Sequence, residues 1–192
     1  IVAFGAKDND DAGSNSGHVR VYSYYNNQWI QLGSDIDGEA VDDHSGFSVS
    51  LSSDGTKVAI GAMENDGGGS NSGHVRVYSW NGTAWAQPVP DIDGEAVDDK
   101  SGYSVSLSGD GKKVAVGALN NDGGGSNSGH VRVYDILTPE ISSVSLAADN
   151  STITVTTSLS VYNSSGGSSD LEASDFALSI SGGSATLTSA TP

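Results

Sequence analysis

A segment of 56 residues recurs along this chain, and this repeat constrains the fold more than any other feature of the sequence. The motif at residues 2–6 returns at 58–62 and again at 114–118. Residues 35–80 and 91–136 carry the same amino acid at 37 of 46 positions. A fixed period of this kind is typical of repeat proteins, in which each unit is one supersecondary element that packs on its neighbours.

Each unit is predicted to contain four short β-strands. Residues 46–51 alternate apolar and small polar side chains, and an Asp-Gly turn leads from them into a second strand at 57–62. A glycine-rich loop precedes a third strand at 74–79, and Asn81-Gly82 turns the chain into a fourth at 84–89. Four antiparallel strands per unit predict an all-β fold of β-propeller blades.

The repeat boundaries define a propeller fragment at residues 1–137, with blade parts at 1–34, 35–90 and 91–137. Three blades are too few for a closed ring, so the ring is expected to be incomplete and completed by upstream blades of the same chain. From residue 138 to 192 the chain has no Lys, Arg or His. This segment resembles a truncated Ig-like β-sandwich module of bacterial surface proteins. Its alternating patterns predict strands at 141–146, 152–156, 171–180 and 185–188.

The order of the motifs resembles the FG-GAP repeat of integrin α-chain-like β-propellers of the bacterial type. Gly46-Phe47 and Gly102-Tyr103 correspond to the FG element, and Gly61-Ala62 and Gly117-Ala118 correspond to the start of the GAP element. The resemblance implies an extracellular or cell-surface protein with an adhesion-type role. The family's acidic calcium loop is replaced here by a short turn at residues 52–57 with one carboxylate, so that calcium site is not carried over.

The formal net charge of −16 argues against nucleic acid and anionic membrane surfaces as partners, because like charges repel. Calcium, a basic protein surface, or simple solubility would each account for the excess of 24 acidic over 8 basic residues. The absence of cysteine excludes disulfides and thiolate zinc sites. No stretch has the length and apolar character that a membrane-spanning helix needs.

Acidic clusters mark two types of loop, and both types are expected to emerge on the same face of the blades. One loop type lies between the fourth strand and the first strand of the next blade, and the other lies between the second and third strands. Their carboxylates could coordinate calcium, or they could be solvated turns with side-chain-to-backbone hydrogen bonds. The candidate calcium ligands are Asp35, Asp37, Glu39, Asp42, Asp66, Asp91, Asp93, Glu95, Asp98 and Asp122.

Three arginines at equivalent positions, Arg20, Arg76 and Arg132, are assigned a structural role. Packing between blades should cover Arg76, and a covered charge needs a partner, for which Asp43 and Asp99 are the candidates.

Three histidines, His18, His74 and His130, each begin the third strand of a different blade, so a metal site shared among them is not expected. Trp29 and Trp85 on the outer strands are interpreted as packing between blades, with a sugar-stacking platform as the alternative.

No catalytic pattern is present: the chain has no nucleophile elbow, no cysteine and no phosphate-binding loop with its lysine. The sequence therefore predicts a non-catalytic module that binds a protein or a glycan through its acidic loop face. A purely structural spacer is the second hypothesis, because the loops of the repeats are nearly identical. The third is an accessory region of a secreted glycan hydrolase or lyase.

Overall fold

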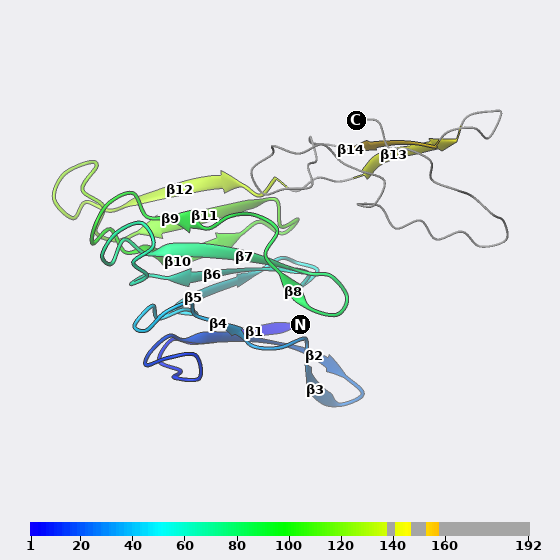
Figure 1. The fold of residues 1–192 in the computed structure, drawn as a ribbon, viewed down its shortest axis with the longest axis horizontal. Helices are drawn as coiled ribbons and strands as arrows, with labels where there is room; N and C mark the ends of the chain where they lie inside the picture. The colour runs from blue at the N-terminus through cyan, green and yellow to red at the C-terminus, as the bar shows by residue number, and fades with distance from the viewer. Residues whose placement is uncertain (138–140, 147–152, 158–192) are drawn as a thin grey trace. The chain divides into compact units, whose positions relative to one another are not determined.

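The computed structural model describes residues 1–137, 141–146 and 153–157, and the regular elements in these ranges are all β-strands. The chain divides into two units, Ile1–Ile136 and Leu137–Pro192. The first unit holds three antiparallel sheets, which lie one above another in sequence order (Figure 1). The all-β prediction is therefore confirmed for the described residues.

Each sheet contains a strand that begins with His-Val-Arg-Val-Tyr and pairs with the strand before it. Sheet 1 contains β1 (Val2–Ala6), β2 (His18–Tyr25), β3 (Gln28–Gln31) and β4 (Ile36–Asp37). Sheet 2 contains β5 (Ser48–Leu51), β6 (Lys57–Ala62), β7 (His74–Trp80), β8 (Trp85–Ala86) and β9 (Ile92–Asp93). Sheet 3 contains β10 (Ser101–Leu107), β11 (Lys113–Ala118) and β12 (His130–Asp135).

The outer strand of sheet 2 differs from the prediction, which placed it at 84–89 without interruption. Two short strands, β8 and β9, pair with opposite ends of β7, through Trp80 with Trp85 and His74 with Asp93. Pro88 and Pro90 lie between them. Because proline has no N–H to donate, the hydrogen bonds between the strands are interrupted there. Residues that were expected in the connection to the next blade therefore still belong to the sheet.

Apolar side chains fill the space between consecutive sheets. One cluster, between sheets 1 and 2, contains Val19 and Val21 of β2 together with Val58 and Ile60 of β6. The cluster between sheets 2 and 3 uses the same positions one repeat later, such as Val75, Val77, Val114 and Val116. The sequence repeat is thus also a repeat of the interface, as expected for stacked units.

Paired glycines bring the backbones of consecutive sheets close together. A Cβ atom added to Gly61 would lie 2.1 Å from the carbonyl oxygen of Gly102, and one added to Gly5 would lie 2.0 Å from that of Gly46. The glycine of one repeat's second strand therefore faces a glycine at or just before the start of the next repeat's first strand. This contact explains why the motif needs glycine at both positions.

The second unit contains one described hairpin. Strands β13 (Ile141–Leu146) and β14 (Ile153–Thr157) pair in antiparallel register, with Leu146 opposite Ile153. These strands agree with the predicted ones at 141–146 and 152–156. The further strands predicted at 171–180 and 185–188 lie outside the described residues, and the Ig-like module stays a prediction.

Candidate functional site

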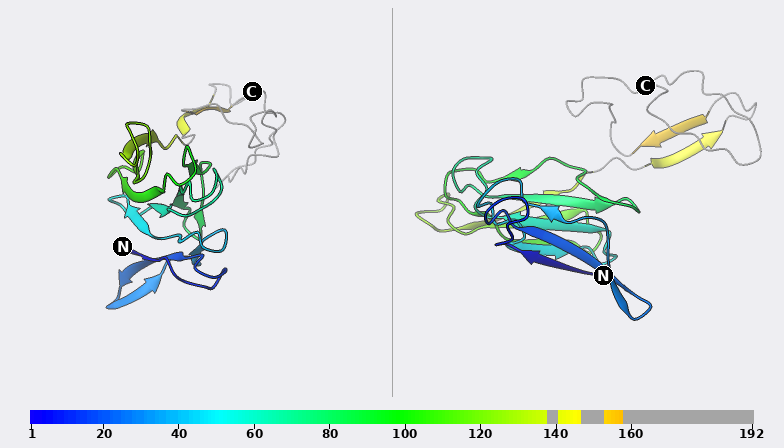
Figure 2. Two further views of the ribbon diagram at one scale, coloured as in Figure 1. Left: turned by 90° about the vertical axis from the view of Figure 1, so that its left-hand side faces the viewer. Right: turned by 60° about the horizontal axis from the view of Figure 1, so that its bottom comes forward.

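Loops of two types lie side by side at one end of the three sheets, which we call the acidic loop face (Figures 1 and 2). It comprises residues 7–17, 37–47, 63–73, 93–100 and 119–129, and so includes the last residues of β4 and β9. Backbone hydrogen bonds join the loop before β5 to the loop before β2, for example from Gly38 N to Gly17 O at 2.8 Å and from Ser45 N to Ser16 O at 2.9 Å. The equivalent bonds recur one repeat later, so the prediction that the two loop types share a face is confirmed.

Asparagine and aspartate side chains hold the glycine-rich loops in shape. Asn65 Oδ1 accepts a hydrogen bond from Gly67 N at 2.7 Å, and Asp66 Oδ1 accepts one from Asn71 N at 2.7 Å. Asp122 Oδ1 does the same for Asn127 N at 2.6 Å. Two of the candidate calcium ligands, Asp66 and Asp122, thus each have an oxygen that accepts a hydrogen bond from the backbone of their own loop.

Two buried aspartates tie each acidic segment to the glycine-rich loop of the same repeat. Asp43 Oδ2 accepts hydrogen bonds from Ala40 N at 2.8 Å and from Asn65 Nδ2 at 3.1 Å. Asp99 repeats this arrangement with Ala96 and Asn121. Both carboxylates are almost fully buried, so these hydrogen bonds offset the cost of removing their charge from water.

Arg76 is buried and paired, but its partner differs from the prediction. Its Nη1 lies 3.3 Å from Glu39 Oε1, and its Nη2 donates to the backbone oxygen of Asp37 at 2.7 Å. The expected partners Asp43 and Asp99 instead accept hydrogen bonds from amide donors. One repeat later Arg132 pairs with Glu95 in the same way.

Arg20 departs from this pattern because it pairs within its own sheet. Its Nε and Nη2 both donate to Asp35 Oδ2, at 2.9 and 2.7 Å, and Gln31 Nε2 donates to Asp35 Oδ1 at 2.6 Å. The hydrogen bonds from Arg20 in particular lower the pKa of Asp35 to about 2. Asp35 is therefore ionised and held in place by its neighbours.

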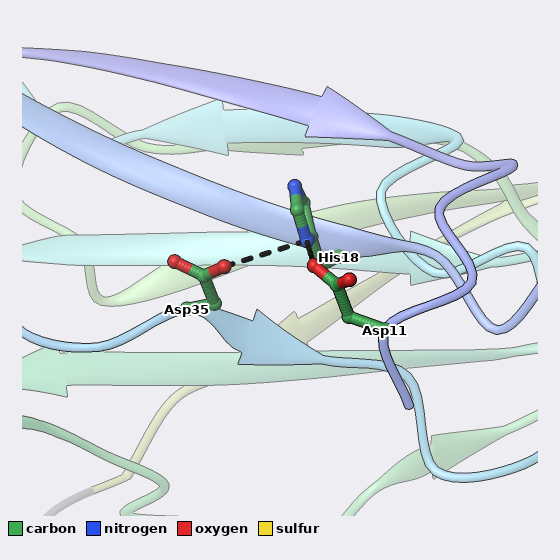
Figure 3. A group of neighbouring side chains, drawn as sticks. All are labelled: Asp11, His18 and Asp35. Atoms are coloured by element: carbon green, nitrogen blue, oxygen red, sulfur yellow. Dashed lines mark ion pairs between the residues drawn. The ribbon is translucent and has the colours of Figure 1, made fainter. Parts of the chain in front are cut away.

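In the described part of the chain, His18 and His74 each present one ring nitrogen to two carboxylates, whereas His44 presents one nitrogen to Asp8 and the other to Glu64. His18 lies between Asp11 and Asp35, with Nδ1 3.9 and 3.6 Å from their oxygens (Figure 3). His74 Nδ1 lies 3.9 Å from both Glu39 and Asp91. The histidines lie in separate sheets, as predicted, but their carboxylate partners were not predicted. One feature of the sequence indicated these partners: an aspartate follows His18 by 17 residues, and another follows His74 by 17 residues.

The candidate calcium ligands are not gathered into one group by the described structure. Asp35 and Asp91 lie beside histidines, whereas Asp42 Oδ1 accepts a hydrogen bond from Asn15 Nδ2 at 3.0 Å. The remaining exposed carboxylates of the set lie along the acidic loop face: Asp37, Asp93, Glu95 and Asp98. Calcium binding stays a prediction.

Trp85 lies between sheets, in agreement with its interpretation as a packing residue. Its Nε1 donates to the carbonyl oxygen of Leu32 in sheet 1 at 2.8 Å, and its ring belongs to the edge of the first apolar cluster. Trp29, the equivalent residue of sheet 1, is 55% exposed and contacts Tyr24 with ring centroids 4.9 Å apart.

Two segments of the chain match a known protein family. Residues 35–78 and 91–134 each match the FG-GAP repeat. The chain contains FG-GAP repeats. The two matched segments run from the acidic segment that follows one sheet to the Val-Arg-Val-Tyr strand of the next. No curated protein sequence matches the chain. Within the described residues, no helix has the length and apolarity needed to cross a membrane.

The geometry explains why the FG-GAP repeats conserve their spacing within this chain. Glycines let the sheets approach, the Val-x-Val strand fills the space between them, and the arginine of each matched repeat reaches the acidic segment at the start of the same repeat. The acidic loop face is therefore built by contacts between repeats, as from Gly38 to Gly17, and by contacts within one repeat, as from Asn65 to Asp43.

Proposed function

We propose that this chain is a non-catalytic interaction module of an extracellular or cell-surface protein, with an adhesion-type role. The observation that supports this proposal most is the alignment of equivalent loops on one face by the backbone hydrogen bonds between consecutive repeats. FG-GAP repeats at residues 35–78 and 91–134 also favour a surface-type repeat module. The FG-GAP match favours propeller blades, which we propose are part of a ring completed by further repeats.

The chemistry of the acidic loop face favours a partner with basic groups. Exposed carboxylates recur at equivalent positions, as at Asp37 and Asp93, and an exposed valine lies near them in each repeat, Val41 at 58% and Val97 at 60% exposure. A protein surface with lysine or arginine around an apolar centre would satisfy both features. A glycan with cationic groups would satisfy the charges alone.

Binding can be tested with the whole chain on an array of basic proteins and of glycans. Replacing Asp37 and Asp93 by Asn and Val41 and Val97 by Ser should abolish binding without unfolding the chain, because all four side chains are exposed. A matched control replaces Asp54 and Asp110 by Asn in the turns at the opposite end of the sheets. Asparagine retains the turn oxygen that accepts from Thr56 N and Lys112 N, and the control removes the same number of charges.

A structural spacer is the second candidate, and the near identity of the repeats favours it. A module that binds one ligand usually needs different loops at different positions, whereas residues 35–80 and 91–136 agree at 37 of 46 positions. Absence of concentration-dependent binding to any array component would favour the spacer over the interaction module.

A further inference from the structure

The histidines that begin β2 and β7 are buried, and each has one ring nitrogen without a hydrogen-bond partner among the described residues: Nδ1 in His18 and Nε2 in His74. His18 is 4% exposed, and its Nδ1 has no hydrogen-bond partner among the described residues. That nitrogen points toward the carboxylates of Asp11 and Asp35 (Figure 3). A buried polar atom without a partner is costly, so its orientation toward two carboxylates requires an explanation.

The same arrangement recurs one repeat later with a different third residue. His74 and Asp91 occupy the positions of His18 and Asp35, but the second carboxylate comes from Glu39, which follows sheet 1. In the first group the second carboxylate, Asp11, comes from the loop that leads into the histidine strand itself. Two different segments of the chain thus place a carboxylate oxygen near equivalent histidine nitrogens.

The donor set of each group fits a divalent metal ion of the zinc type. Such ions take an imidazole nitrogen at about 2.0–2.1 Å and carboxylate oxygens at about 2.0–2.2 Å. The ligand atoms of each group lie within 4.8 Å of one another, so modest side-chain rotations bring them to the spacing around one ion. Calcium and magnesium prefer oxygen ligands alone, and the nitrogen therefore favours zinc, cobalt or a related ion.

Access also suits metal binding. A hollow of about 430 Å³, lined in part by His18 and Arg20, opens beside the first group. Asp11 lies in an exposed loop, so its side chain has room to turn toward the ion.

We propose that Asp11, His18 and Asp35 bind one zinc-type divalent ion and that Glu39, His74 and Asp91 bind a second. Water completes the coordination of each ion. Arg20 and Arg76 hold Asp35 and Glu39, respectively, when no ion is bound, so each arginine competes with the metal for a carboxylate.

The third repeat provides an internal control. His130 begins β12, and Glu95 occupies the position of Glu39, but the residue 17 positions after His130 is Ala147 and not Asp. Glu95 is paired with Arg132. The third repeat therefore lacks one of the three ligands, and we expect the chain to bind two ions and not three.

Calorimetric titration of the untagged chain with Zn²⁺, and visible absorption with Co²⁺, would count the ions. We expect two ions per chain, a loss of one in H18A and in D35N, and a loss of the other in D91N, whose side chain is only half-buried. H130A should keep both. R20Q should lower the dissociation constant of the first site about tenfold, because a positive charge close to the ion is removed.

Several outcomes would overturn the proposal. It would be refuted if the wild-type chain bound no ion, if H18A and D35N bound as many ions as the wild type, or if H130A lost a bound ion. A first site that does not tighten in R20Q would contradict the competition with arginine. Circular dichroism of each variant separates loss of a ligand from loss of the fold. The array experiment repeated in a chelator shows whether the interaction face works without these ions, so the two proposals can fail separately.

Discussion

Replacing Arg76 by methionine tests how the buried arginine stabilises the stack of sheets. The change keeps an unbranched apolar side chain of similar length but removes the hydrogen bond to Asp37 O and the ion pair with Glu39. A hydrogen bond to a charged group contributes about 1.5–3 kcal/mol. The ion pair adds about 0–1 kcal/mol, because the Glu39 side chain is 46% exposed and water screens it.

Two further contributions, opposite in sign, change the loss of stability expected for R76M. The guanidinium carbon lies 5.6 Å from the centroid of the Tyr78 ring, and such a contact contributes about 0.5–1 kcal/mol. Against this, Arg76 Nε is buried with no hydrogen-bond partner among the described residues, and methionine relieves that cost. We expect R76M to lower the free energy of unfolding by about 2 kcal/mol.

Arg132 is the matched control because it occupies the same position one repeat later. It pairs with Glu95, but both side chains are largely exposed, at 46% and 42%. R132M should therefore change the free energy of unfolding by less than about 0.5 kcal/mol. Urea unfolding followed by tryptophan fluorescence would measure both variants, since Trp85 lies between sheets 1 and 2. Equal effects of R76M and R132M, or no effect of R76M, would refute the reasoning.

Three other changes probe the contacts between sheets. G61A should destabilise the chain by about 1–3 kcal/mol or more, because the added Cβ would meet the backbone oxygen of Gly102. In G117A the added Cβ would meet only a serine side chain of the same sheet, so this variant should be less destabilised. Thermal melts of both variants would rank them. Burial lowers the pKa of His74, so the unfolded chain binds more protons than the folded one, and the free energy of unfolding should fall as the pH drops below about 6.5. In H74Q the urea midpoint should depend less on pH than in the wild type. W85F should cost about 1 kcal/mol in the same urea assay, because it loses the hydrogen bond to a carbonyl of sheet 1; an unchanged midpoint would show that this bond contributes nothing.

Strands and turns were predictable because local chemistry determines them. Asp54 illustrates this point: its Oδ1 accepts hydrogen bonds from Ser52 Oγ at 2.7 Å and from Thr56 N at 2.9 Å, and Gly55 has a φ of 71°. The hydrogen bond from Ser52, first of all, lowers the pKa of Asp54 to about 2. All the groups involved lie within five residues, so the sequence alone indicated a tight turn in place of a calcium loop.

The partner of Arg76 was not predictable in the same way, because several carboxylates of the acidic segment lie within reach of the loop face. In the structure Asp43 accepts a hydrogen bond from Asn65, and Glu39 pairs with the arginine; both contacts depend on how sheet 2 packs against the segment that follows sheet 1. The histidine groups were missed for a related reason, since Glu39 and His74 are 35 residues apart. Their proximity follows from the packing of consecutive sheets.

Position in the stack, and not sequence, sets the environment of each repeated residue. Val75 and Val77 are fully buried between sheets 2 and 3, whereas the equivalent Val131 and Val133 of β12 are 68% and 65% exposed. The same residue types therefore contribute to an apolar core in one repeat and to an exposed sheet face in the next. Because the interface between sheets recurs with the repeat, substitutions at equivalent positions separate the contribution of the interface from that of the residue itself. The contrast between R76M and R132M follows directly from this principle.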